Sequence, residues 1–477
     1  MNLTYDPAGG EAFWQAVGQL PGFPHGERIR LGQMIFESGG LFRLPELLAE
    51  TGASRSTPLL VVMDPTEMMR GEDSLKSLLL ETLRIAGFVL QPLVLAPSAD
   101  GQVHTSLEQI NHVKSRLQPG MAALSVGSGV VTDVTKHACF LFEQQSGYPI
   151  PFIVYQTANS VSAYTSNMAP VFIEGVKRTL PSRYPDALLC DLETLRDAPY
   201  EMTVAGVGDL LAASVSLPDW YLAHRLGMDD SYCDLPSSLV GNLDAIMLAH
   251  ATSIRQRTLG GMSLLAKLIS LGGLAMSLVG ASTPMSGYEH LISHALDLQN
   301  EMNGRHLAQH GSQVALAALL ASRAYQVFLD DFNPGVVDPG RPFQPEQETR
   351  KRVLAAFAAI DPSGAAGGEC WADYRLKLER WHGQREALRI FLDDWQQVRA
   401  TLRRLAWLPQ RLREVLDAVG ASLRFSELNP PAGEAEVRFA FFNAPLMRRR
   451  LTLGDALIFF GVDRQRIWQS IQTAGWI

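Results

Sequence analysis

The sequence predicts an α/β dinucleotide-binding domain at the N-terminus followed by an all-helical C-terminal domain. Up to about residue 195, short apolar runs alternate with helical patterns. Such alternation is typical of βαβ units and of a mainly parallel sheet. From about residue 200 the strand signal fades and long helical patterns follow. We therefore place the two domains at residues 1–195 and 196–477, which suits a chain of 477 residues at a loose prior of about 150 residues per domain.

The strands and helices of the first domain can be assigned in order. Residues 75–86 carry apolar side chains at helical spacing, and residues 104–117 open on Thr105-x-x-Glu108, which is typical of a capping box. Parallel sheets of this kind bind ligands outside the carboxyl ends of their strands. Strands are expected at residues 58–64, 88–96, 121–127, 151–157 and 186–191.

The second domain is expected to be helical with two interruptions. Residues 314–324 are rich in Ala and Leu, whereas residues 331–347 and 361–368 have the composition of loops. Residues 261–281 are long enough for a membrane span. Their serines, lysine and glycines favour a buried helix instead, so no membrane span is expected.

Composition and charge exclude several classes of protein. Apolar residues make up 47% of the chain and charged residues 19%, which indicates a folded protein with a large core. The net charge of -8 provides no overall positive field to hold nucleic-acid phosphates. The four cysteines lie far apart without a CxxC pair, so neither a thiolate zinc site nor a disulfide framework is indicated. Because the first residues also lack the features of a signal peptide, we expect a cytoplasmic protein.

A glycine-containing turn at residues 124–136 is the first candidate for ligand binding. An apolar strand ends in Gly127-Ser128-Gly129 and a helical pattern starts at once. Glycines let the backbone approach a pyrophosphate closely, and a helix N-terminus offers free N–H groups to the anion. The full GxGxxG fingerprint is absent, so an ordinary tight turn between strand and helix remains an equal alternative.

Two other strand ends suit the same kind of ligand. Asp64 closes the strand at 58–64, where a carboxylate can accept hydrogen bonds from ribose hydroxyls and would repel a 2′-phosphate. It therefore favours NAD(H) over NADP(H). Residues 157–160, with the sequence Thr-Ala-Asn-Ser, follow the strand at 151–157 and suit the rim of a nucleotide or substrate site.

Histidines gather in a short stretch that suits a divalent metal. His290, His294, His306 and His310 are four of the 11 histidines, and the first two share one helix face at i, i+4 spacing. Two or three imidazoles and one carboxylate would hold an ion with an open position. The carboxylate candidate is Asp209, which also suits a simple helix N-cap. Spacing does not decide whether His294 or His310 joins His290.

These motifs resemble those of the iron-containing alcohol dehydrogenase and dehydroquinate synthase-like superfamily, and within it the sn-glycerol-1-phosphate dehydrogenases. The resemblance covers nearly the whole chain and implies a dehydroquinate synthase-like fold. The matching segments lie at residues 61–71, 126–136, 156–166, 175–181, 191–212, 286–294, 310–320 and 448–461.

The resemblance implies a role for particular residues. It places the metal and the catalytic function on Asp209, His290 and His310, and it implies substrate contacts for Ser162, His294 and Asp209. The implied cofactor contacts, besides Asp64, are Gly127, Ser128, Gly129, Val130, Val131, Thr157, Ala158, Asn159, Ser160 and Ser166.

The chain departs from the pattern of these relatives near the substrate. Relatives commonly carry an Asp that touches substrate where this chain has Ser162, followed by Gly where it has Ala163. Gln156 replaces a common Pro, and Ala213 replaces a common Lys. These changes leave the implied metal and cofactor sites intact and leave the exact substrate open.

We expect an enzyme that uses NAD(H) or NADP(H) and one divalent ion (Zn, Fe or Ni) to reduce dihydroxyacetone phosphate to sn-glycerol 1-phosphate, a reaction of phospholipid metabolism. The metal would act as a Lewis acid on the carbonyl oxygen, with His294 orienting substrate or relaying a proton. Lys177 and Arg178 could reach a substrate phosphate, although solvent exposure is the preferred expectation. The alternatives are a reductase of another polyol or phosphorylated ketone, and a catalytically weak nucleotide-binding relative. A small phosphorylated substrate and a homo-oligomer are the expected partners, without nucleic acid.

Overall fold

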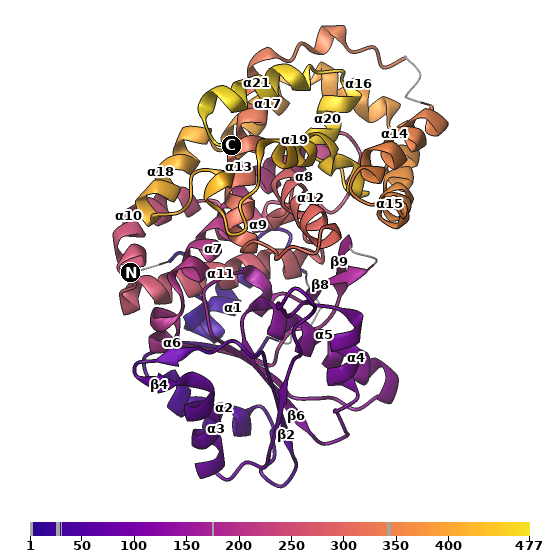
Figure 1. Ribbon diagram of the computed structural model, residues 1–477. Helices are drawn as coiled ribbons and strands as arrows, with labels where there is room; N and C mark the ends of the chain where they lie inside the picture. Colours follow the sequence, from indigo (N-terminus) through magenta and orange to yellow (C-terminus); the bar gives the residue numbers. More distant parts are fainter. Residues whose placement is uncertain (1–2, 25–28, 30, 174–175, 341–344) are drawn as a thin grey trace.

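A six-stranded parallel sheet forms the N-terminal part of the protein, and helices form the remainder (Figure 1). The computed structural model describes residues 3–24, 29, 31–173, 176–340 and 345–477. The strand order is β1-β10-β7-β6-β2-β5. The strands are β1 (Gln33–Glu37), β2 (Leu59–Met63), β5 (Leu90–Val94), β6 (Ala122–Gly127), β7 (Phe152–Gln156) and β10 (Ala187–Asp191). The five predicted strands are confirmed, and β1 was missed.

Helices cover both faces of this sheet. Residues of α2 (Leu44–Glu50) and α3 (Leu75–Ile85) share one buried cluster with side chains such as Val61. Residues of α4 (Leu107–Lys114) and α5 (Gly129–Ser146) share the other with side chains such as Val62. Because successive strand residues point to opposite faces, both faces of the central strands are buried and their sequences read as continuous apolar runs. Helix α1 (Glu11–Gly18) also packs on this second cluster.

The sheet has a topological switch between β2 and β6. These strands are neighbours, with Met63 level with Val126, although β5 lies between them in sequence. The chain runs out to the edge strand β5 and then returns, so the carboxyl ends of β2 and β6 meet at one edge. Open α/β sheets bind ligands at such a point.

Two hairpins outside this sheet were not predicted. The small one pairs β3 (Met69–Arg70) with β4 (Asp73–Ser74). The larger one pairs β8 (Met168–Ile173) with β9 (Val176–Pro181), and it reaches toward the helical part of the protein (Figure 1). Pro170 within β8 weakened the strand signal there, because proline cannot donate to a strand ladder.

From α6 onward the described chain contains only helices and loops, as the sequence predicted. The predicted capping box is wrong by one residue, because Ser106 caps α4 by accepting a hydrogen bond from the Gln109 N–H at 3.3 Å. The α-helices are α6 (Leu192–Asp197), α7 (Tyr200–Leu211), α8 (Ala213–Arg225), α9 (Leu235–Val240), α10 (Leu243–Arg255), α11 (Leu259–Val279), α12 (Tyr288–Met302), α13 (His310–Asp331), α14 (Glu346–Ala358), α15 (Ala365–His382), α16 (Arg385–Asp393), α17 (Trp395–Leu405), α18 (Pro409–Val419), α19 (Glu434–Asn443), α20 (Leu453–Phe459) and α21 (Arg464–Ala474).

Helix α11 is the one helix in the described ranges that is long and apolar enough to cross a membrane. Its most apolar window is 78% buried inside the protein. This agrees with the predicted buried helix, because a lipid-facing span would present most of that surface outward.

Candidate active site

Close packing of two helices brings an acid and a histidine together. Asp209 lies near the end of α7, and His310 is the first residue of α13. A Cβ on Gly208 would lie 2.2 Å from the Gly311 carbonyl oxygen, and a Cβ on Gly311 would lie 1.7 Å from the Ala205 carbonyl oxygen. Only glycine permits backbones to approach so closely. Asp209 lies inside α7 and not at the start of a helix, so its alternative interpretation as an N-cap is wrong.

Helix α12 adds the remaining member of the cluster. The Nδ1 of His290 donates to the carboxylate of Glu289 at 2.8 Å, which leaves its Nε2 facing Asp209 Oδ1 at 3.6 Å. The Nε2 of His310 lies 3.8 Å from the same oxygen. One ligand atom from each of Asp209, His290 and His310 lies within 4.8 Å of the others. Three protein ligands with a fourth position open are typical of catalytic divalent metals, and a carboxylate behind a ligating imidazole is their usual support.

The electrostatics of the cluster suit metal binding. Burial acts to raise the pKa of Asp209, but His290, His310 and Ser162 outweigh it and hold the pKa at about 2. Burial acts to lower the pKa of His290, but Asp209 and Glu289 raise it to about 9. Without a metal ion, the Asp209 carboxylate and the protonated His290 imidazole therefore form a buried ion pair. Burial, followed by the charge of Lys177, lowers the pKa of His310 well below its usual value, so its imidazole is in the neutral, ligating form.

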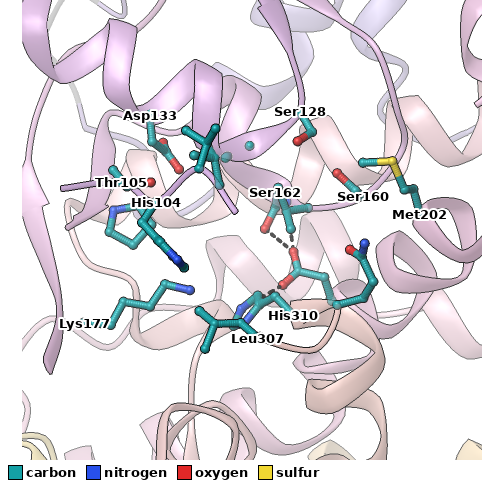
Figure 2. A pocket seen from close by; sticks show the side chains of 18 of the residues that line it. His104, Thr105, Ser128, Asp133, Ser160, Ser162, Lys177, Met202, Leu307 and His310 are labelled. Carbon is teal, nitrogen blue, oxygen red and sulfur yellow. Dashed lines mark hydrogen bonds and ion pairs between the residues drawn. The ribbon is translucent and has the colours of Figure 1, made fainter. Parts of the chain in front are cut away.

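Ser162 contacts the acid of this cluster directly. Its Oγ and its backbone N–H donate to Asp209 Oδ2 at 2.7 and 2.9 Å (Figure 2). Those two bonds occupy Oδ2, so Oδ1 remains for an ion shared with the two histidines. The predicted substrate contact of Ser162 is untested, but its contact with a predicted metal ligand is a role that the sequence did not reveal.

The cluster opens into a cleft of about 530 Å³ between the sheet edge and the helices. Pockets of this size commonly hold cofactors and small substrates. His294 also lines it, with its ring centroid 5.9 Å from that of His310. Burial, then Arg448 and Lys177, lowers the pKa of His294 well below its usual value, so this ring is neutral. The predicted cofactor residues on the cleft wall are Asp64, Ser128, Gly129, Val130, Thr157, Ser160 and Ser166.

The turn after β6 has the geometry of a phosphate-binding loop. Ser128 precedes α5 without a side-chain capping bond, so the first N–H groups of the helix are free for a ligand. A Cβ on Gly127 would lie 2.4 Å from Val131 Cγ2, so this tight turn requires glycine there. The buried Thr157 Oγ1 has no hydrogen-bond partner among the described atoms, although it belongs to a residue on the cleft wall. These features fit the pyrophosphate of a dinucleotide.

The other predicted cofactor residues, Gly127, Val131, Ala158 and Asn159, do not line the cleft. The Asn159 side chain donates to the Met262 carbonyl at 3.1 Å and accepts from Gln156 at 2.8 Å. The Ala158 carbonyl accepts from the Tyr164 hydroxyl at 2.7 Å. These residues shape the loops of the cleft, and their direct cofactor contacts stay predictions.

The expected solvent exposure of Lys177 and Arg178 is wrong. Lys177 lines the cleft with 17% of its side chain exposed, and its Nζ lies 3.8 Å from Asp297 Oδ2. Arg178 is 13% exposed and forms ion pairs with Glu369 and Asp373 on α15. Because neighbouring strand residues point to opposite faces, the ion pairs of Arg178 direct Lys177 toward the cleft. Figure 2 shows Lys177 and His104 on the same side of the cleft.

Comparisons with known proteins find dehydrogenases with similar sequences. The sequence model of a family described as iron-containing alcohol dehydrogenase matches residues 35–199. A Bacillus subtilis (strain 168) protein named glycerol-1-phosphate dehydrogenase (NAD(P)+) is 32% identical over 296 residues, which cover 60% of this chain and 71% of that protein. A Pyrococcus furiosus protein of the same name is 29% identical over 270 residues, 56% of this chain and 71% of that protein. A third, from Halalkalibacterium halodurans, is 36% identical over 203 residues, 43% of this chain and 49% of that protein.

Solved structures show the same fold at low sequence identity. An archaeal halo-thermophilic alcohol dehydrogenase from a Red Sea brine pool has a TM-score of 0.54 at 12% identity, covering 94% of this chain and 99% of that one. A sulfoacetaldehyde reductase from Bifidobacterium kashiwanohense, in complex with NAD+, has a TM-score of 0.53 at 11% identity, with coverage of 90% and 97%. At these identities the likeness concerns the fold and not the substrate.

Proposed function

The chain belongs to the iron-containing alcohol dehydrogenase family and is an NAD(P)-dependent oxidoreductase, and we propose that it reduces dihydroxyacetone phosphate to sn-glycerol 1-phosphate. The observation that carries this proposal is the shared cleft. The cluster of Asp209, His290 and His310 opens into the same cavity as the phosphate-binding loop, with Lys177 on its wall. The carbonyl group of a substrate near the cluster could thus meet a nicotinamide, while the phosphate of the same substrate meets the ammonium of Lys177.

Each group in the cleft has a distinct task in this reaction. The divalent ion supplies Lewis acidity when bound, and the nicotinamide supplies the hydride. Asp209, His290 and His310 would hold the ion, and Ser162 fixes the Asp209 carboxylate by donating to its Oδ2. His294 is a neutral imidazole in the cleft, suited to orient a substrate hydroxyl or to relay a proton through water.

Lys177 is our proposed anchor for the substrate phosphate. Its ammonium is loosely paired, at 3.8 Å from Asp297 Oδ2, and has only 17% of its side chain exposed. Asp297 itself is held by Gln313, whose Nε2 donates to it at 2.9 Å. A cation held in a cleft with little other compensation favours an anionic ligand over a neutral one. This supports a phosphorylated ketone over free dihydroxyacetone or glycerol.

One observation favours a second candidate, the reduction of a different phosphorylated ketone or polyol. Ser162 is engaged with Asp209 and offers no carboxylate to a substrate hydroxyl. A substrate bulkier than a triose can make other contacts in the cleft, so the missing carboxylate would weaken its binding less. The complete cluster of Asp209, His290 and His310 suits a catalytic metal, which argues against a catalytically weak nucleotide-binding protein.

Elemental analysis and a cofactor-oxidation assay test these candidates together. We expect one divalent ion per chain and turnover of dihydroxyacetone phosphate, with free dihydroxyacetone much slower. His290→Ala and His310→Ala should each lose metal and most activity, whereas His306→Ala, an exposed histidine from the same stretch, should not. Undiminished metal binding in the first two variants would overturn the metal site. Absence of turnover with every triose phosphate, in protein that binds metal and cofactor, would leave only the family assignment. A homo-oligomer and a cytoplasmic location remain predictions.

A further inference from the structure

The carboxyl end of β2 carries an ion pair that the sequence did not predict. Asp64 follows β2 and lines the cleft, with 18% of its side chain exposed. Lys76, the second residue of α3, is 14% exposed and places its Nζ 2.6 Å from Asp64 Oδ1. The same Nζ donates to the backbone carbonyl oxygens of Asp64 at 2.6 Å and of Thr66 at 2.5 Å.

These contacts determine which hydrogen bonds Lys76 and Asp64 can still offer to a ligand. An ammonium has three hydrogens, and the three acceptors use all of them, so Lys76 has no donor left for a cofactor. Its positive charge nevertheless stays against the Asp64 carboxylate. The Thr66 N–H also donates to Asp64 Oδ1, at 3.2 Å. Since both side-chain bonds end on Oδ1, Oδ2 keeps its capacity to accept a hydrogen bond from a ribose hydroxyl.

We infer that Lys76 sets the cofactor tolerance of this enzyme by neutralising Asp64, so that the ribose end of the cleft accepts the 2′-phosphate of NADP(H) as well as the 2′-hydroxyl of NAD(H). An unpaired carboxylate at a β-strand end would accept from the hydroxyl and repel the phosphate. With an ammonium at 2.6 Å, the pair has no net charge. Attraction of the phosphate by Lys76 then offsets most of its repulsion by Asp64.

The pairing with Lys76 changes the expectation from sequence that Asp64 favours NAD(H). In the sequence Asp64 is an isolated carboxylate, because nothing there pairs it with a residue 12 positions later. The inference depends on NAD(P) binding alone and not on the identity of the substrate. A failure of the dihydroxyacetone phosphate assay would therefore leave it standing.

A binding cycle on the metal-loaded enzyme tests the inference. Dissociation constants for NADH and NADPH are measured by calorimetry for the wild type, Lys76→Met, Asp64→Asn and the double variant. Lys76→Met should weaken NADPH by about tenfold or more relative to NADH, because it leaves Asp64 as an unpaired anion. Asp64→Asn should shift the ratio the opposite way. Lys351→Met, at an exposed lysine of α14, is the control and should change neither constant.

The double variant separates charge neutralisation from the other contacts of Lys76. If Lys76 acts by balancing the charge of Asp64, the double variant should return the NADPH to NADH ratio to near the wild-type value, because its pair of side chains again has no net charge. A double variant that binds NADPH as weakly as Lys76→Met does would mean that Lys76 holds the phosphate without regard to Asp64, and it would overturn the inference. Equal weakening of both cofactors by Lys76→Met would also overturn it, because Lys76 would then serve only to hold residues 64–66 in place.

Discussion

Replacing Lys177 with Met isolates the proposed phosphate anchor. Methionine keeps the unbranched apolar stem of the side chain, and the change removes the ammonium that lies in the cleft 3.8 Å from Asp297 Oδ2. The stem packs near Phe172, with Nζ 5.6 Å from the ring centroid, so the variant should keep the local fold. Asp297 is already buried, and burial raises its pKa, so it can take up a proton when its partner is lost.

The size of the effect follows from the contact that would be lost. A hydrogen bond between a charged donor and a phosphate contributes about 1.5–3 kcal/mol, and each ~1.4 kcal/mol corresponds to tenfold. We therefore expect kcat/KM for dihydroxyacetone phosphate to fall by about 10- to 100-fold, mostly through KM. Free dihydroxyacetone has no phosphate, so its low kcat/KM should change little. This contrast between the two ketones is the expected signature of an anchor.

Steady-state kinetics on both ketones, with metal and cofactor saturating, measures this contrast. Lys177→Arg keeps the charge and should recover part of the loss. Equal losses with the two ketones would refute the anchor. They would indicate that Lys177 acts on the metal cluster, since its charge also lowers the pKa of His310.

Three further changes test the surroundings of the cluster. Glu289→Gln should lower metal affinity by about 10- to 100-fold, because it weakens the support of His290 Nδ1; competition with a chelator measures this, and unchanged affinity would contradict it. Ser162→Asp should destabilise the metal-free protein by about 1–3 kcal/mol, because it places a second carboxylate against Asp209. Urea unfolding should show that metal restores the stability of the variant. Equal stability of the two metal-free proteins would contradict the contact between residue 162 and Asp209. Asp219→Asn tests pH dependence, because burial and then Glu289 raise the pKa of Asp219 from 3.8 to about 8. The folded state holds this proton through that interval and the unfolded state does not, so stability falls as pH rises from about 4 to 8 and should fall less in the variant. An identical slope in pH-dependent urea unfolding of the two proteins would assign the effect to other groups.

Buried strands were predictable from sequence, and strands that depend on tertiary contacts were not. β6, β7 and β10 are buried on both faces, so each reads as an apolar run that periodicity detects. β1 has the polar residues Gln33 and Glu37 at its ends, and among the described strands it pairs only with β10, which is far away in sequence. Nothing local marks it as a strand.

The candidate site shows the same limit. Spacing alone placed His290 and His294 on one face but could not choose between His294 and His310, and the resemblance to known dehydrogenases made that choice. The physical reason for it is the close contact of Gly208 with Gly311, which no local pattern reveals. Glu289 and Lys76 were missed because their roles depend on where a partner points.

The contacts of Ser162 connect the substrate question to the charge of the cleft. The sequence resemblance implies an acid at this position in related dehydrogenases, whereas Ser162 is neutral and donates to Asp209 Oδ2 at 2.7 Å. The wall near the metal cluster thus carries one negative charge fewer, while Lys177 adds a positive one. In a cleft shielded from water both features attract an anion more strongly than they would in bulk solvent. A neutral polyol gains nothing from them and also lacks the carboxylate that would accept its hydroxyl. We therefore expect negligible activity on free glycerol, and equal rates on glycerol and on glycerol phosphate would show that charge does not select the substrate.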